Sequence, residues 1–164
     1  MRRRTVLAAV PTVALAGCMD AIKGPDSAEA EALVREAINA ERGGAGVAAL
    51  DSRDELAEAA RGHSRDMHER DFYSHQNPDG EQPWDRVACN ASENIHRGEI
   101  GQMRIPGGDG TYQTRLTEEL ARYVADGWIN SQSHYENMVD ASWAAVGVGV
   151  FVGGDDFFAT AMFC

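Results

Sequence analysis

The final part of the chain changes its hydrophobic period, and this change constrains the fold more than any other feature of the sequence. In A-V-G-V-G-V-F-V at 145–152, valines alternate with Gly147, Gly149 and Phe151. Such alternation is typical of a β-strand with one buried face. G-G-D-D at 153–156 predicts a hairpin turn, and F-F-A-T-A-M-F at 157–163 predicts the returning strand. Glycines opposite the valines predict that another element packs closely on their face.

Most of the chain before this hairpin has helical spacing. Ser27 is the predicted N-cap of a first helix, which ends at Gly43 and Gly44. A second helix is expected from Asp51 or Ser52 to just before S-H-Q-N-P-D-G at 74–80. Further helical segments are expected as a short turn at 82–88, a third helix from Thr114 and a fourth over 133–139. Residues 96–113 are expected to form a long irregular segment with weak strand character. Helices first and strands last predict an α+β fold, with helices covering a small antiparallel sheet.

The first eighteen residues have the pattern of an export signal. Arg2, Arg3 and Arg4 precede a short apolar stretch that ends in L-A-G-C at 15–18. The stretch is too short to span a bilayer, and R-R-T-V-L at 3–7 fits the twin-arginine pattern. L-A-G-C resembles a lipobox, in which Cys18 would carry the lipid; an ordinary cleaved signal with an incidental cysteine is the alternative. We therefore expect a signal at 1–17, a tether at 18–26, a domain at 27–164, and a lipoprotein on the outer face of the membrane.

The chain is acidic and almost free of lysine. Its formal net charge is −11, and Lys23 is its one lysine. Removal of the signal would make the charge more negative still, because Arg2–Arg4 are lost with it. Such a surface repels nucleic acid, so no nucleic-acid partner is expected. An acidic, lysine-poor surface is typical of halophilic proteins, in which concentrated salt screens the self-repulsion; a merely acidic protein is the alternative.

Two of the three cysteines remain if Cys18 carries a lipid. Cys89 and Cys164 could then pair, because an exported protein meets an oxidising environment. N-A-S at 90–92 is a glycosylation sequon at Asn90, although many such sequons are unused.

Several motifs in order along the chain resemble those of the CAP superfamily, which includes the cysteine-rich secretory, antigen 5 and pathogenesis-related proteins, and in particular its prokaryotic SCP-like branch. They are I-N-A-E-R at 38–42, L-A-E-A-A-R-G-H-S-R-D-M at 56–67, F-Y-S-H-Q-N-P-D-G at 72–80, S-E-N-I at 92–95, W-I-N-S-Q-S-H-Y-E-N-M at 128–138, V-G-V-G-V at 146–150 and the closing M-F-C. The resemblance implies an α-β-α sandwich with helices on both sides of a central antiparallel sheet. It also implies that the segment after Cys89 runs beside the final strand, which would favour a Cys89–Cys164 disulfide.

The resemblance further implies an open cavity lined by His75, Glu93 and His134, with Ser131 nearby. Two imidazoles and a carboxylate could hold Zn²⁺ or another divalent cation. The family's second cavity glutamate is absent, since Asn130, Ser131 and Gln132 occupy that region. Each residue also has a structural alternative: His75 could tie down its loop, Glu93 could accept backbone N–H bonds, and His134 could begin a helix.

We expect a monomeric, surface-tethered protein that binds a small apolar molecule, a lipid or an envelope component without catalysis. The alternative is a metal-dependent hydrolase, such as a peptidase, that uses His75, Glu93 and His134. Nucleophilic catalysis has little support, because the chain contains no G-x-S-x-G. H-E-R-D at 68–71 is followed by Phe72 and so is not the H-E-x-x-H motif of zinc proteases.

Overall fold

A computed structural model describes residues 24–106 and 108–164, which hold a large hydrophobic core. The predicted export signal and Cys18 lie outside the described residues. The helices are α1 (Ser27–Gly44), α2 (Asp54–Glu69), the 3₁₀ turn η1 (Pro83–Asp85), α3 (Thr117–Ile129) and α4 (Gln132–Met138). The strands are β1 (Asp51–Ser52), β2 (Ser92–Glu99), β3 (Gln102–Arg104), β4 (Thr111–Gln113), β5 (Ala145–Gly153) and β6 (Asp156–Phe163).

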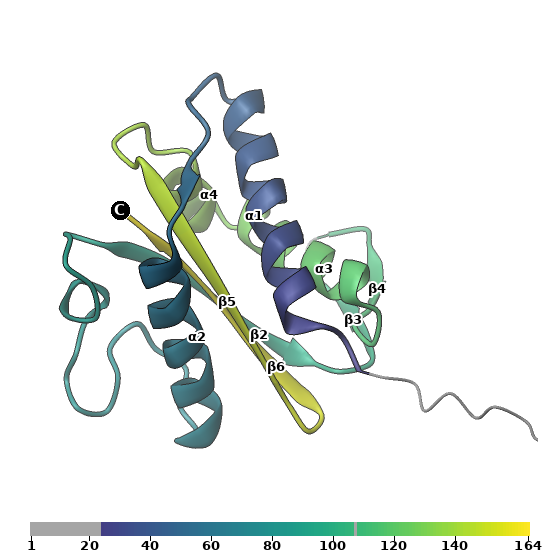
Figure 1. The fold of residues 1–164 in the computed structure, drawn as a ribbon. Helices are drawn as coiled ribbons and strands as arrows, with labels where there is room; N and C mark the ends of the chain where they lie inside the picture. Colours follow the sequence, from purple (N-terminus) through teal and green to yellow (C-terminus); the bar gives the residue numbers. More distant parts are fainter. Residues whose placement is uncertain (1–23, 107) are drawn as a thin grey trace, which may run out of the picture.

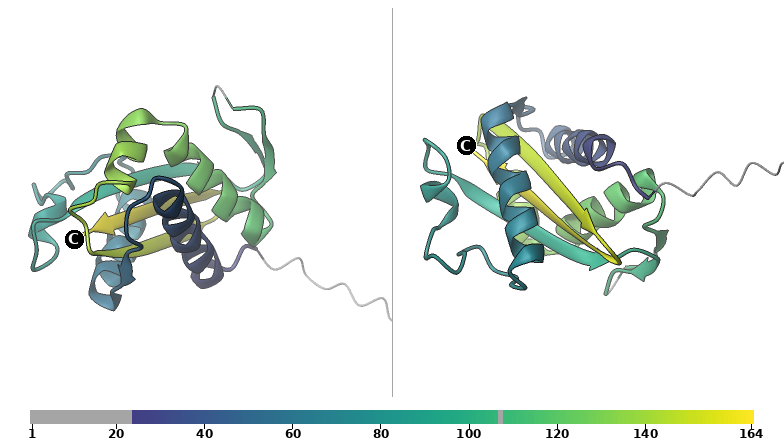
Figure 2. Two further views of the ribbon diagram at one scale, coloured as in Figure 1. Left: turned by 90° about the horizontal axis from the view of Figure 1, so that it is seen from above. Right: turned by 60° about the horizontal axis from the view of Figure 1, so that its bottom comes forward.

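The elements form three layers. Helix α2 covers one face of the sheet, and α1, α3 and α4 cover the other (Figures 1 and 2). The valine face of β5 lies in the larger core cluster together with Val34 and Ile38 of α1 and Leu120 and Trp128 of α3. The predicted α-β-α sandwich is therefore confirmed.

The main sheet has the strand order β1-β5-β6-β2. The predicted hairpin is present: β5 and β6 pair antiparallel from Val146 opposite Phe163 to Gly153 opposite Asp156, and Gly154 adopts a positive φ in the turn. Strand β2 pairs antiparallel with the other edge of β6. The sheet is not wholly antiparallel, because β1 pairs with β5 in parallel. Strands β3 and β4 form a separate two-stranded sheet.

Helix α2 lies directly on the backbone of β5. A Cβ atom on Gly147 would come within 2.1 Å of the backbone nitrogen of Ala57, and one on Gly149 within 2.1 Å of that of Arg61. No side chain fits at either position, because these neighbours are main-chain atoms that cannot swing aside. The close approach predicted from the glycines is confirmed.

The first two predicted helix starts were wrong. Asp26, not Ser27, is the N-cap of α1, and its carboxylate accepts from the N–H groups of Ala28 and Glu29 at 3.1 and 3.2 Å. The second helix begins only at Asp54, because Asp51 and Ser52 pair with Ala145 and Val146 instead. Both residues are good caps in isolation, and the strand that pairs with them is distant in the sequence.

The predicted start of α3 was also wrong, whereas the weak strand character expected over 96–113 is confirmed by β3 and β4. Thr114 does not open α3; its buried hydroxyl donates to the Glu99 carbonyl at 2.6 Å and accepts from Gly101 N–H at 2.8 Å. These bonds tie the end of β4 to the end of β2, and α3 starts at Thr117. Strand β2 runs from Ser92 to Glu99 beside β6, as the resemblance implied for the segment after Cys89, and it includes the first four residues of the 96–113 segment.

Arg42, on α1, is completely buried, which no sequence pattern predicted. Its guanidinium donates to the carbonyls of Ala48, Met138 and Asp140 at 2.7, 2.8 and 2.9 Å. Burial lowers the pKa of Arg42, although Asp140 raises it in part. One side chain therefore fixes α1 to the segment that joins α4 to β5.

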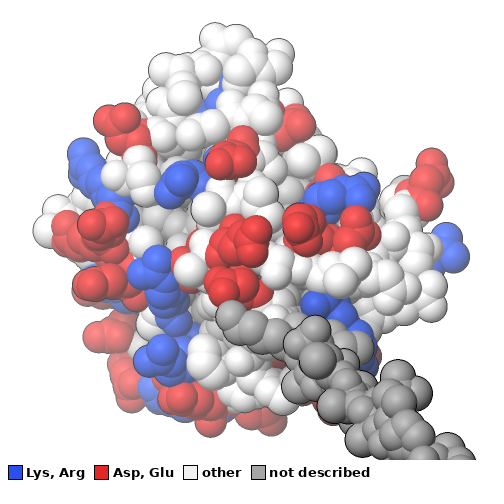
Figure 3. Space-filling view, turned by 45° about the vertical axis from the view of Figure 1, so that its right-hand side comes forward, with Lys and Arg blue, Asp and Glu red and all other residues white. Residues whose placement is uncertain are grey.

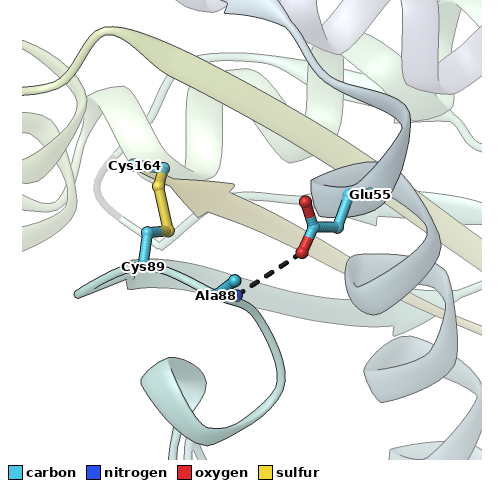
Figure 4. Close-up of a disulfide and its surroundings, with 4 residues drawn as sticks. All are labelled: Glu55, Ala88, Cys89 and Cys164. Carbon is cyan, nitrogen blue, oxygen red and sulfur yellow. Dashed lines mark hydrogen bonds between the residues drawn. A yellow bond between two sulfur atoms is a disulfide. The ribbon is translucent and has the colours of Figure 1, made fainter.

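Cys89 and Cys164 form a disulfide, as predicted, with Cα atoms 6.2 Å apart. Figure 4 shows the bridge joining the segment before β2 to the end of β6, beside a 3.4 Å hydrogen bond from Ala88 N–H to the Glu55 carboxylate. The bridge spans 75 positions of sequence, so chain-entropy reasoning gives it roughly 4 kcal/mol of stabilisation.

Acidic side chains are spread over the surface. Figure 3 shows Asp and Glu scattered across one face with arginines between them, rather than gathered into a single patch. Within residues 24–106 and 108–164, no helix is both long and apolar enough to cross a membrane.

Candidate functional site

The candidate site centres on the buried carboxylate of Glu93. Strand alternation turns Glu93 and Asn94 to opposite faces of β2, with Glu93 on the side of α2. The Glu93 side chain is only 1% exposed, so its charge needs partners inside the protein. Oε1 lies 2.9 Å from His75 Nδ1 and 3.5 Å from His63 Nε2, and Oε2 accepts from Arg86 Nη1 at 2.9 Å.

His75 and Arg86 come from the loop that joins α2 to β2. His75 is about half exposed at 49%, whereas the Arg86 side chain is 9% exposed. The Arg86 guanidinium also donates to the carbonyls of His75 and Glu81, so it closes the loop on itself. The loop therefore presents His75 to solvent while its inner side is bonded to Glu93.

His63 is a member of this cluster that sequence reasoning did not assign to the site. It lies on α2, and its Nε2 is 3.0 Å from the Ser74 carbonyl. Because that oxygen can only accept, Nε2 carries the proton. Burial lowers the pKa of His63, and the negative charge of Glu93 offsets part of that effect. The signal that could have located it is its helical spacing with Leu56, Ala60 and Met67, which places it on the buried face.

His134 belongs to a neighbouring group on the opposite side of β2. It lies on α4, and its carbonyl accepts from Asn94 Nδ2 at 2.9 Å, while Asn94 Oδ1 accepts from Asn137 at 2.9 Å. Its Nδ1 is buried without a partner in the described part of the chain. Burial, followed by the charge of His75, lowers the pKa of His134.

The predicted residues are thus brought together only in part. His75 and Glu93 are in direct contact, whereas His134 is not among the partners of Glu93 in residues 24–106 and 108–164. Ser131 is the N-cap residue of α4, and its side chain makes no capping bond there. Asn90 is exposed next to the disulfide, and its glycosylation stays a prediction.

The side chains of His75, Glu93 and His134 are not arranged to bind a metal ion in this structure. The described residues contain no group of three or more His, Cys, Asp or Glu side chains that could hold one. Arg86 supplies the positive charge that balances Glu93, and each carboxylate oxygen already has a partner. A cation at His75, Glu93 and His134 would compete with the Arg86 guanidinium for the Glu93 carboxylate.

A cleft of about 300 Å³ opens beside His75 and Glu93. Its rim carries Trp84, which is 51% exposed and is one of the large apolar side chains that face solvent. The remaining lining residues are Gln82, Pro83, Ala91 and Ser92. The cleft therefore combines an exposed aromatic ring with a half-exposed imidazole whose orientation is fixed by a buried carboxylate.

The model of the cysteine-rich secretory protein family, CAP, matches residues 35–164. The chain is similar to the uncharacterized protein YkwD of Bacillus subtilis (strain 168), with 28% identity over 137 residues, or 79% of this chain and 46% of YkwD. It is similar in fold to an extracellular SCP-domain protein of Bacillus anthracis str. Ames, with TM-score 0.63 and 23% identity, over 84% of this chain and 40% of that one. It therefore spans less than half the length of these two proteins.

A further likeness is to an outer surface protein of Borrelia burgdorferi, with TM-score 0.67 and 16% identity, covering 86% of this chain and 96% of that one. At these identities the solved structures support the fold alone.

Proposed function

Because the chain belongs to the cysteine-rich secretory protein (CAP) family, we propose that it is an exported, non-catalytic binding protein tethered through a lipid on Cys18. Its ligand is a small molecule with an apolar part, such as a lipid or an envelope component, held in the cleft beside His75, Glu93 and Trp84. The similarity to an extracellular protein and to an outer surface protein supports a place outside the cell.

The observation that carries the proposal is the exposed Trp84 at the rim of this cleft. An aromatic side chain that leaves half of its surface in water is available for contact with an apolar group. A few oriented polar groups within a partly apolar cleft are the usual composition of a small-molecule site. His75 supplies such a group, because its bond to Glu93 holds the ring in place.

The occupied carboxylate supports binding rather than catalysis. Glu93 is engaged by both His75 and Arg86, so a metal ion or a substrate proton would compete with these two partners for the carboxylate. The alternative is a metal-dependent hydrolase using His75, Glu93 and His134, in which the metal ion would share Glu93 with Arg86 or replace it.

Tryptophan fluorescence tests ligand binding. We expect decanoate, as a probe with an apolar chain, to shift the emission of the domain 24–164, and Trp84→Phe to remove most of that shift. In calorimetric titration, which does not depend on the Trp84 emission, Trp84→Ala should weaken decanoate binding about tenfold, because the main aromatic contact is lost. Leu116→Ala is the matched control, since Leu116 is a comparably exposed apolar side chain, at 54%, outside the cleft. Equal weakening in both alanine variants would contradict the proposal.

Metal analysis of the same domain, purified without a histidine tag, separates the two functions. We expect decanoate binding to be unchanged by a chelator. Stoichiometric Zn²⁺ that is lost in both His75→Ala and His134→Ala, together with a chelator-sensitive hydrolysis, would favour the hydrolase instead.

The tether has its own test in cells. Cys18→Ser should release the protein from the membrane to the medium, because the lipid would have no attachment point. Unchanged membrane association of this variant would disprove the anchor while leaving the binding proposal intact.

A further inference from the structure

A second cavity lies on helix α2 and shares no lining residue with the cleft of Trp84. Its volume is about 540 Å³, within the range of small-molecule sites. The lining comes from α2 and from the loop between α2 and β2. The residues are Ala59, Gly62, His63, Asp66, Arg70, Asn77, Asp79, Glu81, Asp85 and Arg86.

The charges around this cavity leave a negative excess. Four carboxylates, of Asp66, Asp79, Glu81 and Asp85, face two guanidinium groups. Arg70 pairs with Asp79 at 2.5 Å and with Asp66 at 3.4 Å, whereas Arg86 pairs with Glu93 outside the lining. Glu81 and Asp85 have no cationic partner among residues 24–106 and 108–164, so their charges remain available to a cation.

Loop hydrogen bonds hold both free carboxylates in place. Asn77 Oδ1 accepts from the N–H groups of Asp79 and Glu81, and Asn77 Nδ2 donates to Glu81 Oε2 at 2.7 Å. Asp85 Oδ2 accepts from Gln82 N–H at 2.9 Å. Each carboxylate still has an oxygen free of these contacts.

His63 provides an independent indication of a ligand. Its side chain is 1% exposed, it lines the cavity, and its Nδ1 has no partner within the described residues. Since Nε2 carries the proton toward Ser74, Nδ1 of the neutral ring is an acceptor that lacks a donor. Arg86 Nε, on a second lining side chain, is a buried donor that lacks an acceptor among the same residues. A buried polar atom without a partner is costly, so a ligand that satisfies both atoms, once small side-chain shifts open them to the cavity, gains affinity.

We propose that this cavity binds a small organic cation that carries N–H donors and an oxygen acceptor, such as an amine or guanidine compound with a carbonyl group. The positive group lies against Glu81 and Asp85, an N–H group donates to His63 Nδ1, and the oxygen accepts from Arg86 Nε. This cavity shares no lining residue with the cleft of Trp84, although His63 and Arg86 also contact Glu93, which lines that cleft.

L-Argininamide is a suitable probe, because it combines a guanidinium, an ammonium and a carbonyl oxygen. In calorimetric titration of the domain 24–164 we expect saturable binding. Glu81→Gln and Asp85→Asn should each weaken it about two- to fivefold, and the double variant about tenfold, since these pairs lie near the surface. Both substitutions keep the oxygen that accepts the loop hydrogen bond, so the loop should stay folded.

Two controls separate recognition from general attraction of cations. Glu118→Gln removes the same charge from an exposed position on α3, outside the cavity, and should leave binding unchanged. Choline is a cation without N–H donors and should not compete. Equal weakening by Glu118→Gln, or equally tight binding of choline, would overturn the proposal.

The imidazole ¹⁵N spectrum provides a direct readout of His63. Binding of L-argininamide should move the Nδ1 resonance of His63, whereas that of His68, which does not line the cavity, should stay in place. Saturable binding without any change at His63 would also overturn the assignment.

Discussion

Arg42 and Glu93 are both buried charges, but they are neutralised in different ways. Arg42 is surrounded by main-chain carbonyls, those of Ala48, Met138 and Asp140 among them. Glu93 is surrounded by the side chains of His75, Arg86 and His63. The first set of partners moves only if the backbone moves, whereas members of the second set can change rotamer.

The difference separates a charge held by the backbone from a charge that belongs to the proposed binding site. Because its carbonyl partners belong to the backbone, the Arg42 side chain is restricted to one conformation. It therefore holds α1 against the end of α4. Two partners of Glu93 come from an exposed loop, and loops positioned on a rigid scaffold commonly carry function. A ligand in the cleft could therefore alter the surroundings of Glu93 but not those of Arg42.

The strongest test removes the structural charge. Arg42→Met should destabilise the domain by about 3–5 kcal/mol, because several buried carbonyls lose their donor at once. Urea unfolding followed by circular dichroism measures this. Arg35→Ala is the matched control on the same helix: Arg35 is bonded through an exposed contact to Ser52 and should cost less than about 0.5 kcal/mol. A small effect of Arg42→Met would remove the distinction between the two sites.

Glu93→Gln should cost less, about 2–3 kcal/mol, since the amide oxygen can still accept from His75 while Arg86 loses its counter-charge. If the loss comes mainly from an uncompensated Arg86, the double variant Glu93→Gln with Arg86→Met should be more stable than additive single effects predict. Strict additivity in unfolding measurements would show that the two groups are not coupled.

Acid should destabilise the domain through buried histidines, which lie on both faces of β2. Burial, followed by the charge of His134, lowers the pKa of His96 from 6.5 to about 4. Below pH 6.5 the unfolded chain takes up a proton that the folded chain does not bind, so stability is lost as the pH falls from 6.5 to 4. The loss from His96 alone should reach about 2 kcal/mol at about pH 5.

The pKa values of His63 and His134 are lowered as well and add to this loss. Unfolding free energies at about pH 7 and pH 5, in the parent chain and in His96→Leu, measure the contribution. An identical loss in both proteins would refute the role of His96.

The fold could be predicted because its strongest signals are local. The alternating valines of β5, the turn at Gly154 and the helical spacing of α1 and α2 each follow from neighbouring residues. The parallel pairing of Asp51 with Ala145 depends on contacts between distant parts of the chain, so the start of α2 was predicted too early.

The site was predicted less completely for the same reason. The motifs identified His75 and Glu93, and the structure places them in contact. Arg86 lacks a local signal, since only the folded loop brings it to Glu93. The helical spacing of His63 predicts a buried position on α2 but not its contact with Glu93. The alternation of side chains along a strand explains why Glu93 and Asn94 contact different sets of residues. It can be applied only once residues 92–99 are known to be a strand.

The two glycines of β5 have a consequence for the cleft, although they lie two strands away from β2. The bare backbone at Gly147 and Gly149 sets the depth at which α2 rests on the sheet. That depth decides how far His63 stands from Glu93 and where the loop that carries His75 begins. The distance between the imidazoles and the Glu93 carboxylate is thus set by how α2 packs on the sheet and not by the site residues alone. A methyl group at either glycine would lift α2 and increase that distance, so a change that touches no ligand could still alter what the cleft accepts.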